Sequence, residues 1–192
     1  MHRIVLIRHG EAAKSATDPD PGLTETGHGQ ARALVDTFTA DYAGGDNVQL
    51  VSSPKKRALQ TARPIAGIWE RPVEQAPAVI EIPSPQGLPL ARRGAWIQEL
   101  LDSRWSQLEP AQQLWRQHTL DFLKSLADSR YHTTLVFCHF VVINSVVAAV
   151  RNDDRVVQFH PDYTSMTELY LDKGELRLVE LGRERRIENA IQ

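Results

Sequence analysis

The chain has 192 residues, 42% of them hydrophobic and 24% charged, an ordinary globular mixture that excludes a disordered or fibrous protein. At about 150 residues per domain, this length predicts one domain, which can bury roughly 70% of its unfolded surface without disulfides or metals. Lys and Arg number 22 against 24 Asp and Glu, a formal net charge of -2, so we expect no nucleic-acid partner.

Short β-branched runs alternate with longer helical patterns along the first half of the chain, as in βαβ units. Thr24 is a favourable helix N-cap, and Ser53 followed by Pro54 places an N-cap before a proline at the first helical position. The elements expected here are a strand over 3–7, a helix from 24 that stops at 44–45, a strand over 48–51, and a helix from 53 to about 69.

The second half contains further elements of both kinds. Pro83 and Pro85 end a third strand, and the turn sequence 172–174 separates two alternating runs, which predicts a closing hairpin. The tail from Arg183 onward is charged, and we expect it to be exposed. The elements expected here are a strand over 76–82, a helix from 91 to about 126, a strand over 133–138, a helix over 141–150, and hairpin strands over 164–171 and 175–181. The core contacts expected on the long helix are Trp96, Leu100, Leu114, Phe122 and Leu126.

The longest apolar tract, residues 135–150, falls short of the roughly 20 residues that cross a bilayer, so it predicts a buried strand followed by a buried helix. The N-terminal apolar run 4–7 is too short for a signal peptide. The single cysteine, Cys138, excludes an intramolecular disulfide, which fits a reducing compartment. We therefore expect a cytoplasmic protein without a membrane partner.

Together these elements predict an α/β fold, a three-layer α/β/α sandwich with a mostly parallel central sheet. The first strand is apolar throughout, as expected for a strand covered by helices on both faces. Because no repeat, low-complexity segment or linker divides the chain, we expect a single domain over 1–192 with a helical insertion over roughly 91–127. The sequence leaves the oligomeric state open.

Reactive residues gather where the predicted strands end. Ligands of open α/β sheets bind beyond the carboxyl ends of the strands. The residues that this rule brings to one edge of the sheet are Arg8 and His9 after the first strand, Arg57 after the second, Glu81 after the third and His139 after the fourth. Their convergence is the strongest functional signal in the sequence.

Each of these residue types suits phosphoryl transfer. A guanidinium group matches phosphate oxygens with two parallel hydrogen bonds. A neutral imidazole is a nucleophile near neutral pH, and a carboxyl group can protonate a leaving alkoxide and then activate water. The helix expected to begin at Ser53 adds its positive end to the same place.

Four motifs follow this pattern along nearly the whole chain. They are Arg8-His9-Gly10-Glu11; Leu23-Thr24-Glu25-Thr26-Gly27 with Gln30-Ala31; Ser52-Ser53-Pro54 with Arg57-Ala58-Leu59-Gln60-Thr61-Ala62; and Val136-Phe137-Cys138-His139. In this order and context they resemble the motifs of the histidine phosphatase superfamily, the phosphoglycerate-mutase-like enzymes.

The resemblance implies residue roles. His9 is expected to attack phosphorus and form a phosphohistidine, while Arg8, Arg57 and His139 hold the phosphoryl oxygens and Glu81 donates the proton. The family's chemistry uses no metal and no other cofactor. The resemblance therefore implies a phosphatase of small-molecule phosphomonoesters, of the metal-independent histidine acid type.

Two positions bear on the shape of the phosphate pocket. Phe140 stands where the family usually has glycine. Its backbone N–H is still able to donate to phosphate, whereas its ring is expected to narrow the pocket or to wall it with apolar surface. Ser15 lies in the first loop, where some relatives place a polar residue that binds phosphate.

The segment after Glu81 also departs from the family, because residues 82–85 read Ile-Pro-Ser-Pro where many members have a glycine and a Trp-Glu-Gly segment. Glu99 and Glu74 are therefore alternative proton donors. Two alternative functions remain open. They are a mutase that returns the phosphoryl group to its substrate, and a weakly catalytic regulatory protein that binds a phospho-ligand.

Other phosphatase mechanisms conflict with the sequence. A cysteine phosphatase needs arginine six positions after its cysteine, and the residue six positions after Cys138 is Asn144. The sequence contains no P-loop and neither a His-Glu-x-x-His nor a paired-cysteine metal motif.

Overall fold

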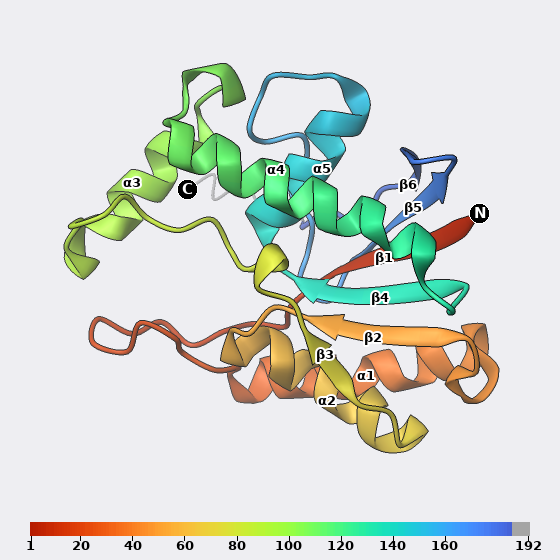
Figure 1. Ribbon diagram of the computed structural model, residues 1–192. Helices are drawn as coiled ribbons and strands as arrows, with labels where there is room; N and C mark the ends of the chain where they lie inside the picture. Colours follow the sequence, from red (N-terminus) through yellow and green to blue (C-terminus); the bar gives the residue numbers. More distant parts are fainter. Residues whose placement is uncertain (186–192) are drawn as a thin grey trace.

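Figure 1 shows the computed structural model of the chain, in which a six-stranded sheet lies between helices. The structure describes residues 1–185. Its strands are β1 (His2–Arg8), β2 (Val48–Ser52), β3 (Val73–Gln75), β4 (Thr133–Cys138), β5 (Met166–Asp172) and β6 (Glu175–Glu180). Its α-helices are α1 (Glu25–Asp41), α2 (Lys56–Trp69), α3 (Arg93–Leu101), α4 (Pro110–Ser125) and α5 (Phe140–Arg151). Single 3₁₀ turns lie at Ala43–Gly45, Pro77–Val79, Leu90–Arg92, Trp105–Gln107 and Leu126–Asp128.

The sheet is mostly parallel, as the sequence predicts, with the strand order β3-β2-β4-β1-β5-β6. β1 pairs in parallel with β4, Arg8 lying opposite Cys138, and β2 pairs in parallel with both β4 and β3. β5 runs antiparallel to β1, and β6 runs antiparallel to β5. The carboxyl ends of β1, β2 and β4 therefore meet at one edge of the sheet.

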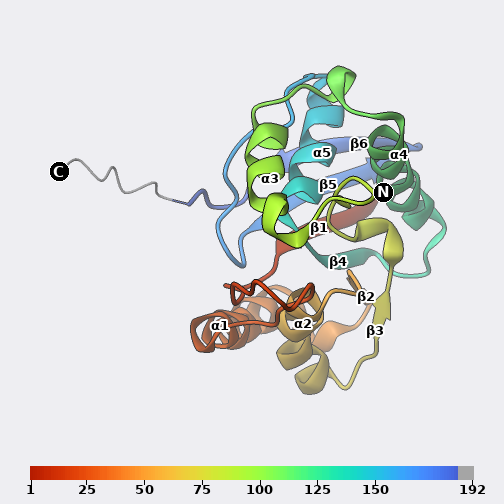
Figure 2. The ribbon, with the colours of Figure 1, turned by 90° about the vertical axis from the view of Figure 1, so that its left-hand side faces the viewer.

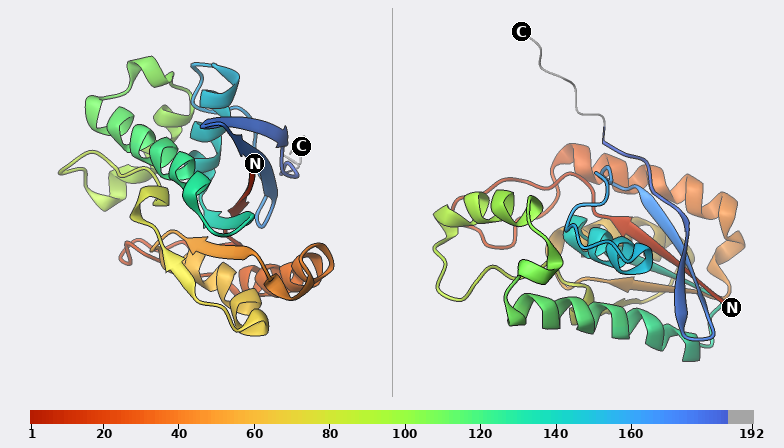
Figure 3. Two further views of the ribbon diagram at one scale, coloured as in Figure 1. Left: turned by 45° about the vertical axis from the view of Figure 1, so that its right-hand side comes forward. Right: turned by 90° about the horizontal axis from the view of Figure 1, so that it is seen from above.

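Helices cover both faces, which makes three layers (Figures 2 and 3). α1 and α2 lie on one face and α4 and α5 on the other, while α3 lies beyond the carboxyl ends of the strands (Figure 1). Alternate residues of β1 account for the two cores, because successive side chains of a strand point to opposite faces. Ile4 and Leu6 pack in the cluster that contains α5, whereas Val5 and Ile7 pack in the cluster that contains α1 and α2.

The apolar tract 135–150 is a buried strand followed by a buried helix, as expected. Every residue of β4 is buried, and so are residues 141–148 of α5. Within residues 1–185, no helix is both long enough and apolar enough to cross a membrane.

The third strand is shorter and earlier than predicted. β3 ends at Gln75, and the apolar residues after it form an irregular strap over α4 rather than a strand. Pro77 has no N–H to continue the ladder, while Val79 and Ile82 are buried in the core. Side chains of α4 satisfy the carbonyls of the strap instead: Trp115 donates to Ile80 at 3.0 Å and Thr119 donates to Ala78 at 2.8 Å.

The helix predicted from 91 to 126 is broken into α3 and α4 by the segment 102–109. Pro110 stands at the first position of α4, and Glu109 and Gln112 form a capping box before it. Leu114 is 55% exposed, so its expected core contact is wrong, while Leu100 and Leu126 are buried. A proline inside a helical pattern begins a second helix here.

Thr24 caps α1 as predicted, since its hydroxyl accepts from the N–H of Gly27. α2 begins at Lys56 rather than at Ser53, and Lys55, with an extended backbone, stands at its N-cap. Residues 183–185 are exposed, and the rest of the predicted charged tail, 186–192, lies outside the described residues.

Candidate active site

The side chains that the motifs singled out lie together at the carboxyl edge of the sheet. His9 follows β1 and His139 follows β4, and their ring centroids are 5.3 Å apart in an edge-to-face arrangement. Parallel pairing of β1 with β4 produces this contact, because the two strands end in register. Both rings are buried, at 7% and 0% exposure.

The hydrogen bonds of His9 define its tautomer. Nδ1 lies 2.7 Å from the carbonyl oxygen of Gly10, so Nδ1 carries the proton and donates it to that oxygen. The Nε–H of Arg57 donates to Nε2 at 3.2 Å. Burial, with the charges of Arg57 and Arg8, lowers the pKa of His9 to about 3. The ring is therefore neutral at physiological pH, with its lone pair on Nε2.

His139 is held by Ser53, from the segment between β2 and α2. Its Nε2 lies 2.7 Å from the hydroxyl oxygen of Ser53, which also accepts from the N–H of Lys55 at 3.3 Å. Within the described residues, Nδ1 of His139 is buried and has no hydrogen-bond partner. Burial and the neighbouring His9 and Arg57 hold the pKa of His139 well below its usual value. If the Ser53 hydroxyl donates to Nε2, the neutral ring carries its proton on Nδ1, which is then a hydrogen-bond donor.

Two aromatic rings hold the guanidinium of Arg8. Its central carbon lies 4.4 Å from the ring centroid of Tyr163 and 5.3 Å from that of Phe140, distances at which cation–π attraction acts. Nη1 donates to the carbonyl of Pro161 at 2.7 Å, and Nε is buried without a partner in the described part of the chain. Burial lowers the pKa of Arg8, and the charge of Glu81 opposes this effect.

Arg57 projects from the first turn of α2 toward His9. The same helix supports the loop after β1, because the hydroxyl of Thr61 accepts from the N–H of Gly10 at 3.0 Å. Burial lowers the pKa of Arg57, and the charge of Glu81 raises it. Two guanidinium groups from different elements therefore act on the His9 ring, Arg57 by a hydrogen bond to Nε2 and Arg8 by its charge.

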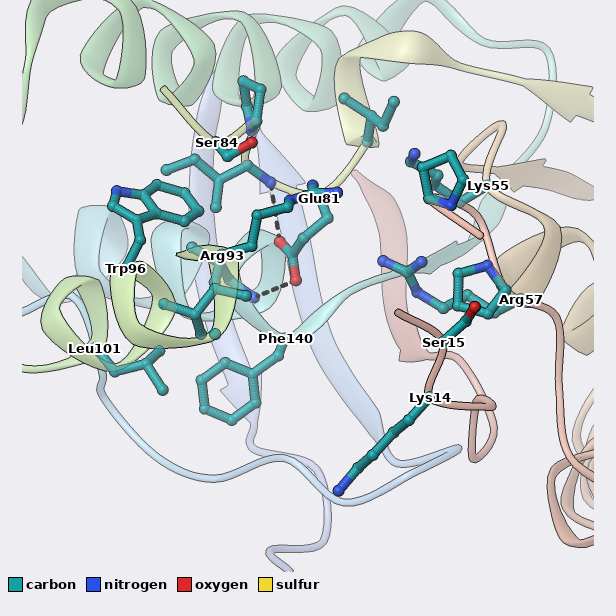
Figure 4. Close-up of a pocket in the computed structure, with 18 of the residues that line it drawn as sticks. Lys14, Ser15, Lys55, Arg57, Glu81, Ser84, Arg93, Trp96, Leu101 and Phe140 are labelled. Carbon is teal, nitrogen blue, oxygen red and sulfur yellow. Dashed lines mark hydrogen bonds between the residues drawn. The ribbon is translucent and has the colours of Figure 1, made fainter. Parts of the chain in front are cut away.

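Glu81 lies in the strap that replaces the predicted strand and reaches the same site. Its two carboxyl oxygens accept from the backbone N–H groups of Ile82 at 3.1 Å and Val141 at 3.2 Å (Figure 4). Burial raises the pKa of Glu81 above its ordinary value, against the effect of these hydrogen bonds and of Arg57. A carboxyl group with a raised pKa is suited to donating a proton near neutral pH.

A cavity of about 880 Å³ opens at this edge and contains most of these residues in its lining. Arg8, Arg57, Glu81, Phe140 and Ser15 all line it, and the last four are labelled in Figure 4. The hydroxyl oxygen of Ser15 accepts from the N–H groups of Thr17 and Asp18, which leaves its hydrogen free to donate. The two histidines are buried and do not belong to the lining, but Arg57, which does, donates to Nε2 of His9.

Glu99 and Glu74, the other carboxylates considered as proton donors, lie elsewhere. Neither lines the cavity, and Glu74 accepts a hydrogen bond from Gln49 on the neighbouring strand. Sequence reasoning missed Tyr163 and gave Ser53 only as a helix N-cap within its motif; their contacts with Arg8 and His139 join segments far apart in the chain. No spacing rule signals either contact. In the described part of the chain, no cluster of three or more His, Cys, Asp or Glu side chains forms a metal site.

The sequence also matches a model of a known protein family. A sequence model described as the histidine phosphatase superfamily (branch 1) matches residues 4–184. The chain belongs to the histidine phosphatase superfamily. Comparison with functionally characterised protein sequences found no significant match.

Solved structures of the same superfamily fold superpose on nearly the whole chain. A mycobacterial glucosyl-3-phosphoglycerate phosphatase in complex with inorganic phosphate has a TM-score of 0.72 at 18% identity, covering 96% of this chain and 98% of its own. A phosphoserine phosphatase from Entamoeba histolytica in complex with 3-phosphoglyceric acid has a TM-score of 0.70 at 21% identity, covering 96% of this chain and 98% of its own. At these identities the likeness establishes the fold.

Proposed function

We propose that this histidine phosphatase superfamily member hydrolyses phosphomonoesters through a phosphohistidine on His9. The observation that carries the proposal is the state of the His9 ring: it is buried and neutral, its Nδ1–H is fixed on the Gly10 carbonyl, and its Nε2 accepts from Arg57 with the charge of Arg8 also acting on the ring. An imidazole held in one tautomer beside positive charge is prepared to attack an anionic phosphoryl group.

In the first step, the Nε2 lone pair of His9 forms a bond to phosphorus, and the bond from phosphorus to the leaving oxygen breaks. The carboxyl proton of Glu81 passes to that oxygen, so the product leaves as an alcohol. Arg8, Arg57 and Nδ1 of His139 donate to the phosphoryl oxygens, with Ser15 and the backbone N–H of Phe140 as further donors at the pocket wall. Preorganised donors of this kind stabilise the charge that develops in the transition state.

In the second step, a water molecule attacks the phosphorus of the phosphohistidine. The carboxylate of Glu81 takes a proton from this water, the bond from phosphorus to Nε2 breaks, and its electron pair returns to His9. Inorganic phosphate leaves, and Glu81 is again protonated. The two guanidinium groups supply the positive charge, so we expect no divalent ion to be required.

The solved structures support a phosphatase over the alternatives, since the mycobacterial and Entamoeba histolytica proteins are named as phosphatases and were crystallised with phosphate or 3-phosphoglyceric acid. No contact among the described residues favours a mutase or a regulatory protein. A small phosphomonoester is the expected partner, and the described lining identifies no single natural substrate.

The proposal predicts that His9→Ala abolishes turnover while the fold persists, because His9 lies at a strand end and contributes chemistry rather than sheet pairing. Rapid quenching with ³²P-labelled substrate should trap an acid-labile phosphoenzyme in the wild type and none in His9→Ala. Activity should persist in EDTA, and circular dichroism should show the variant folded.

Comparing phosphate release with phosphoryl return to added product separates hydrolysis from mutase activity. A folded His9→Ala protein that keeps substantial turnover would contradict the mechanism. Binding without turnover in the wild type would favour the regulatory alternative.

A further inference from the structure

The cavity extends well beyond the phosphoryl site. Its volume of about 880 Å³ is at the upper end of the range typical of sites for drug-sized ligands, roughly 300–1,000 Å³. The part farther from the histidines is bounded by α3, by the strap after β3 and by the first residue of α5 (Figure 4). A leaving group that extends from the phosphoryl group toward α3 occupies this part.

The walls of that outer part are largely apolar. Trp96 and Leu101 face the cavity from α3, and Phe140 faces it from α5 (Figure 4). The further apolar lining residues of this part are Ile80, Ile82, Leu90, Ile97 and Val141. An apolar leaving group placed between these walls buries apolar surface of both the ligand and the protein, which favours binding. A small hydroxylated leaving group leaves the apolar walls exposed to water.

One cation stands within this apolar part. Arg93, at the start of α3, extends into the cavity (Figure 4), and it takes part in none of the ion pairs formed within residues 1–185. Burial is the largest cause of the lowered pKa of Arg57, and the nearby charge of Arg93 lowers this pKa further. The charges of Arg57 and Arg8, not that of Arg93, act on the pKa of Glu81, and the oxygens of Glu81 accept from backbone N–H groups.

The charge around the cavity exceeds what one phosphate group requires. Besides Arg8 and Arg57, the lining carries Lys14, Lys55 and Arg93, together with Arg185 near the C-terminal end of the described chain. Its acidic members are Asp18 and Glu81. A ligand with a second anionic group offsets this excess, and an anion held away from bulk water by arginine gains more than one in solvent.

Building on the phosphatase function proposed above, we propose that the outer cavity selects phosphomonoesters whose leaving group is an apolar body of aromatic size carrying a second anionic group, with Arg93 binding that anion and Trp96 packing on the body. Arg93 and Trp96 lie one helical turn apart on α3, so one face of this helix presents both contacts.

The apolar half of the inference is tested with two esters that release primary alcohols. Benzyl phosphate and glycerol 1-phosphate lose leaving groups of similar basicity, so their kcat/KM ratio reports contacts rather than chemistry. We expect the wild type to prefer benzyl phosphate by about tenfold or more, a fraction of what burying an aromatic side chain typically provides. Trp96→Ala should reduce this preference, and Trp96→Leu should restore part of it.

The anionic half uses a neutral isostere. The wild type should hydrolyse 4-carboxybenzyl phosphate with a kcat/KM about tenfold above that of 4-carbamoylbenzyl phosphate, as expected for a charged hydrogen bond. Arg93→Gln should bring this ratio close to one. Arg92→Gln, which removes the same charge from the exposed neighbouring residue outside the cavity lining, should leave the ratio as in the wild type.

The outcomes separate this inference from the phosphatase proposal. Hydrolysis of all four esters without either preference, or equal ratios in Arg93→Gln and Arg92→Gln, overturns the inference alone. If no ester is hydrolysed, the phosphatase proposal fails, and calorimetric binding decides the subsite. In that case 2-(4-carboxyphenyl)ethylphosphonate should bind about tenfold more tightly than its carbamoyl analogue, and equal affinities overturn the inference.

Discussion

Ser53 shows how a single side chain takes a part that its sequence motif does not indicate. As a serine before proline it predicts a helix N-cap, yet α2 begins three residues later and the hydroxyl of Ser53 lies against Nε2 of His139. Both residues are fully buried. The hydrogen bond fixes the orientation of the His139 ring and leaves its other nitrogen without a partner in the described part of the chain.

Glu81 is tested through the leaving group. A general acid matters most when the departing oxygen is strongly basic, whereas a nitrophenolate leaves readily without a proton. Glu81→Gln should therefore slow phosphoenzyme formation from an alkyl phosphate by about 10²–10⁴-fold, with much less effect for nitrophenyl phosphate. Single-turnover measurements of the first step check this. Equal slowing of both substrates would show that Glu81 is not the proton donor.

Tyr163 is expected to position Arg8 rather than to touch the substrate. Its ring lies 4.4 Å from the Arg8 guanidinium and 6.2 Å, centroid to centroid, from His9. Tyr163→Leu removes a cation–π contact of about 0.5–2 kcal/mol and should weaken inorganic phosphate binding by roughly 2- to 30-fold. Tyr163→Phe keeps the ring and should bind phosphate as the wild type does. Equal weakening in both variants would assign the effect to the hydroxyl group instead.

At the scale of elements, α1 packs directly on the loop that carries the site. A Cβ atom added to Gly27 would lie 2.0 Å from the carbonyl oxygen of Glu11, and one added to Gly10 would lie 2.7 Å from the carbonyl oxygen of Gly27. Gln30 of α1 also accepts from the N–H of Glu11 at 2.7 Å. Both glycines of these motifs therefore permit close backbone approach between α1 and the loop after β1.

This contact predicts opposite effects for two glycines of the same helix. Gly27→Ala should lower the free energy of unfolding by about 1–3 kcal/mol, because the backbone of the loop must move. Gly29→Ala meets only the end of the Arg32 side chain at 3.8 Å and should raise it by about 0.5–1 kcal/mol through helix propensity. Urea titration measures both. Similar effects of the two substitutions would mean that α1 does not pack so closely on the loop.

At the scale of the whole molecule, burying the site couples its chemistry to the stability of the fold. Folding takes His9 and His139 into an environment where burial lowers both pKa values, and the buried Glu81 carries a raised pKa. A histidine with a lowered folded pKa contributes stability above its unfolded value of 6.5 and loses it as the pH falls toward the folded pKa. The raised pKa of Glu81 has the opposite effect on the pH dependence, because its contribution to stability is lost as the pH rises through its folded pKa.

The free energy of unfolding should therefore rise with pH between about 4 and 6.5, with up to about 1.4 kcal/mol per pH unit from each buried histidine. His139→Gln should reduce this slope by one histidine's share. His118→Gln, on the exposed face of α4, serves as the control for removing a histidine from the surface. Urea titrations across this pH range measure it, and an unchanged slope in His139→Gln would show that His139 is protonated in the folded state.

Much of the architecture is determined locally and could be predicted. Apolar runs over 3–7 and 133–138 specify strands covered on both faces, and Thr24 specifies the start of α1, because hydrophobic period and capping are properties of a few neighbouring residues. The same holds for the turn 172–174, where Lys173 and Gly174 adopt positive φ angles of 50° and 80°. The motifs around His9, Arg57 and His139 determined the family on their own.

Tertiary structure decided those features for which the local sequence allows more than one conformation or contact. The apolar segment 76–82 carries strand-like residues, but Trp115 and Thr119 of α4 donate to its carbonyls, and it forms the strap that places Glu81. The contacts of Ser53 with His139 and of Tyr163 with Arg8 join residues 86 and 155 positions apart in the sequence. The cavity likewise brings residues of α3 together with residues of the loop after β1. Such contacts depend on which surfaces the folded sheet brings together, and hydrophobic pattern and turn chemistry act only over a few residues.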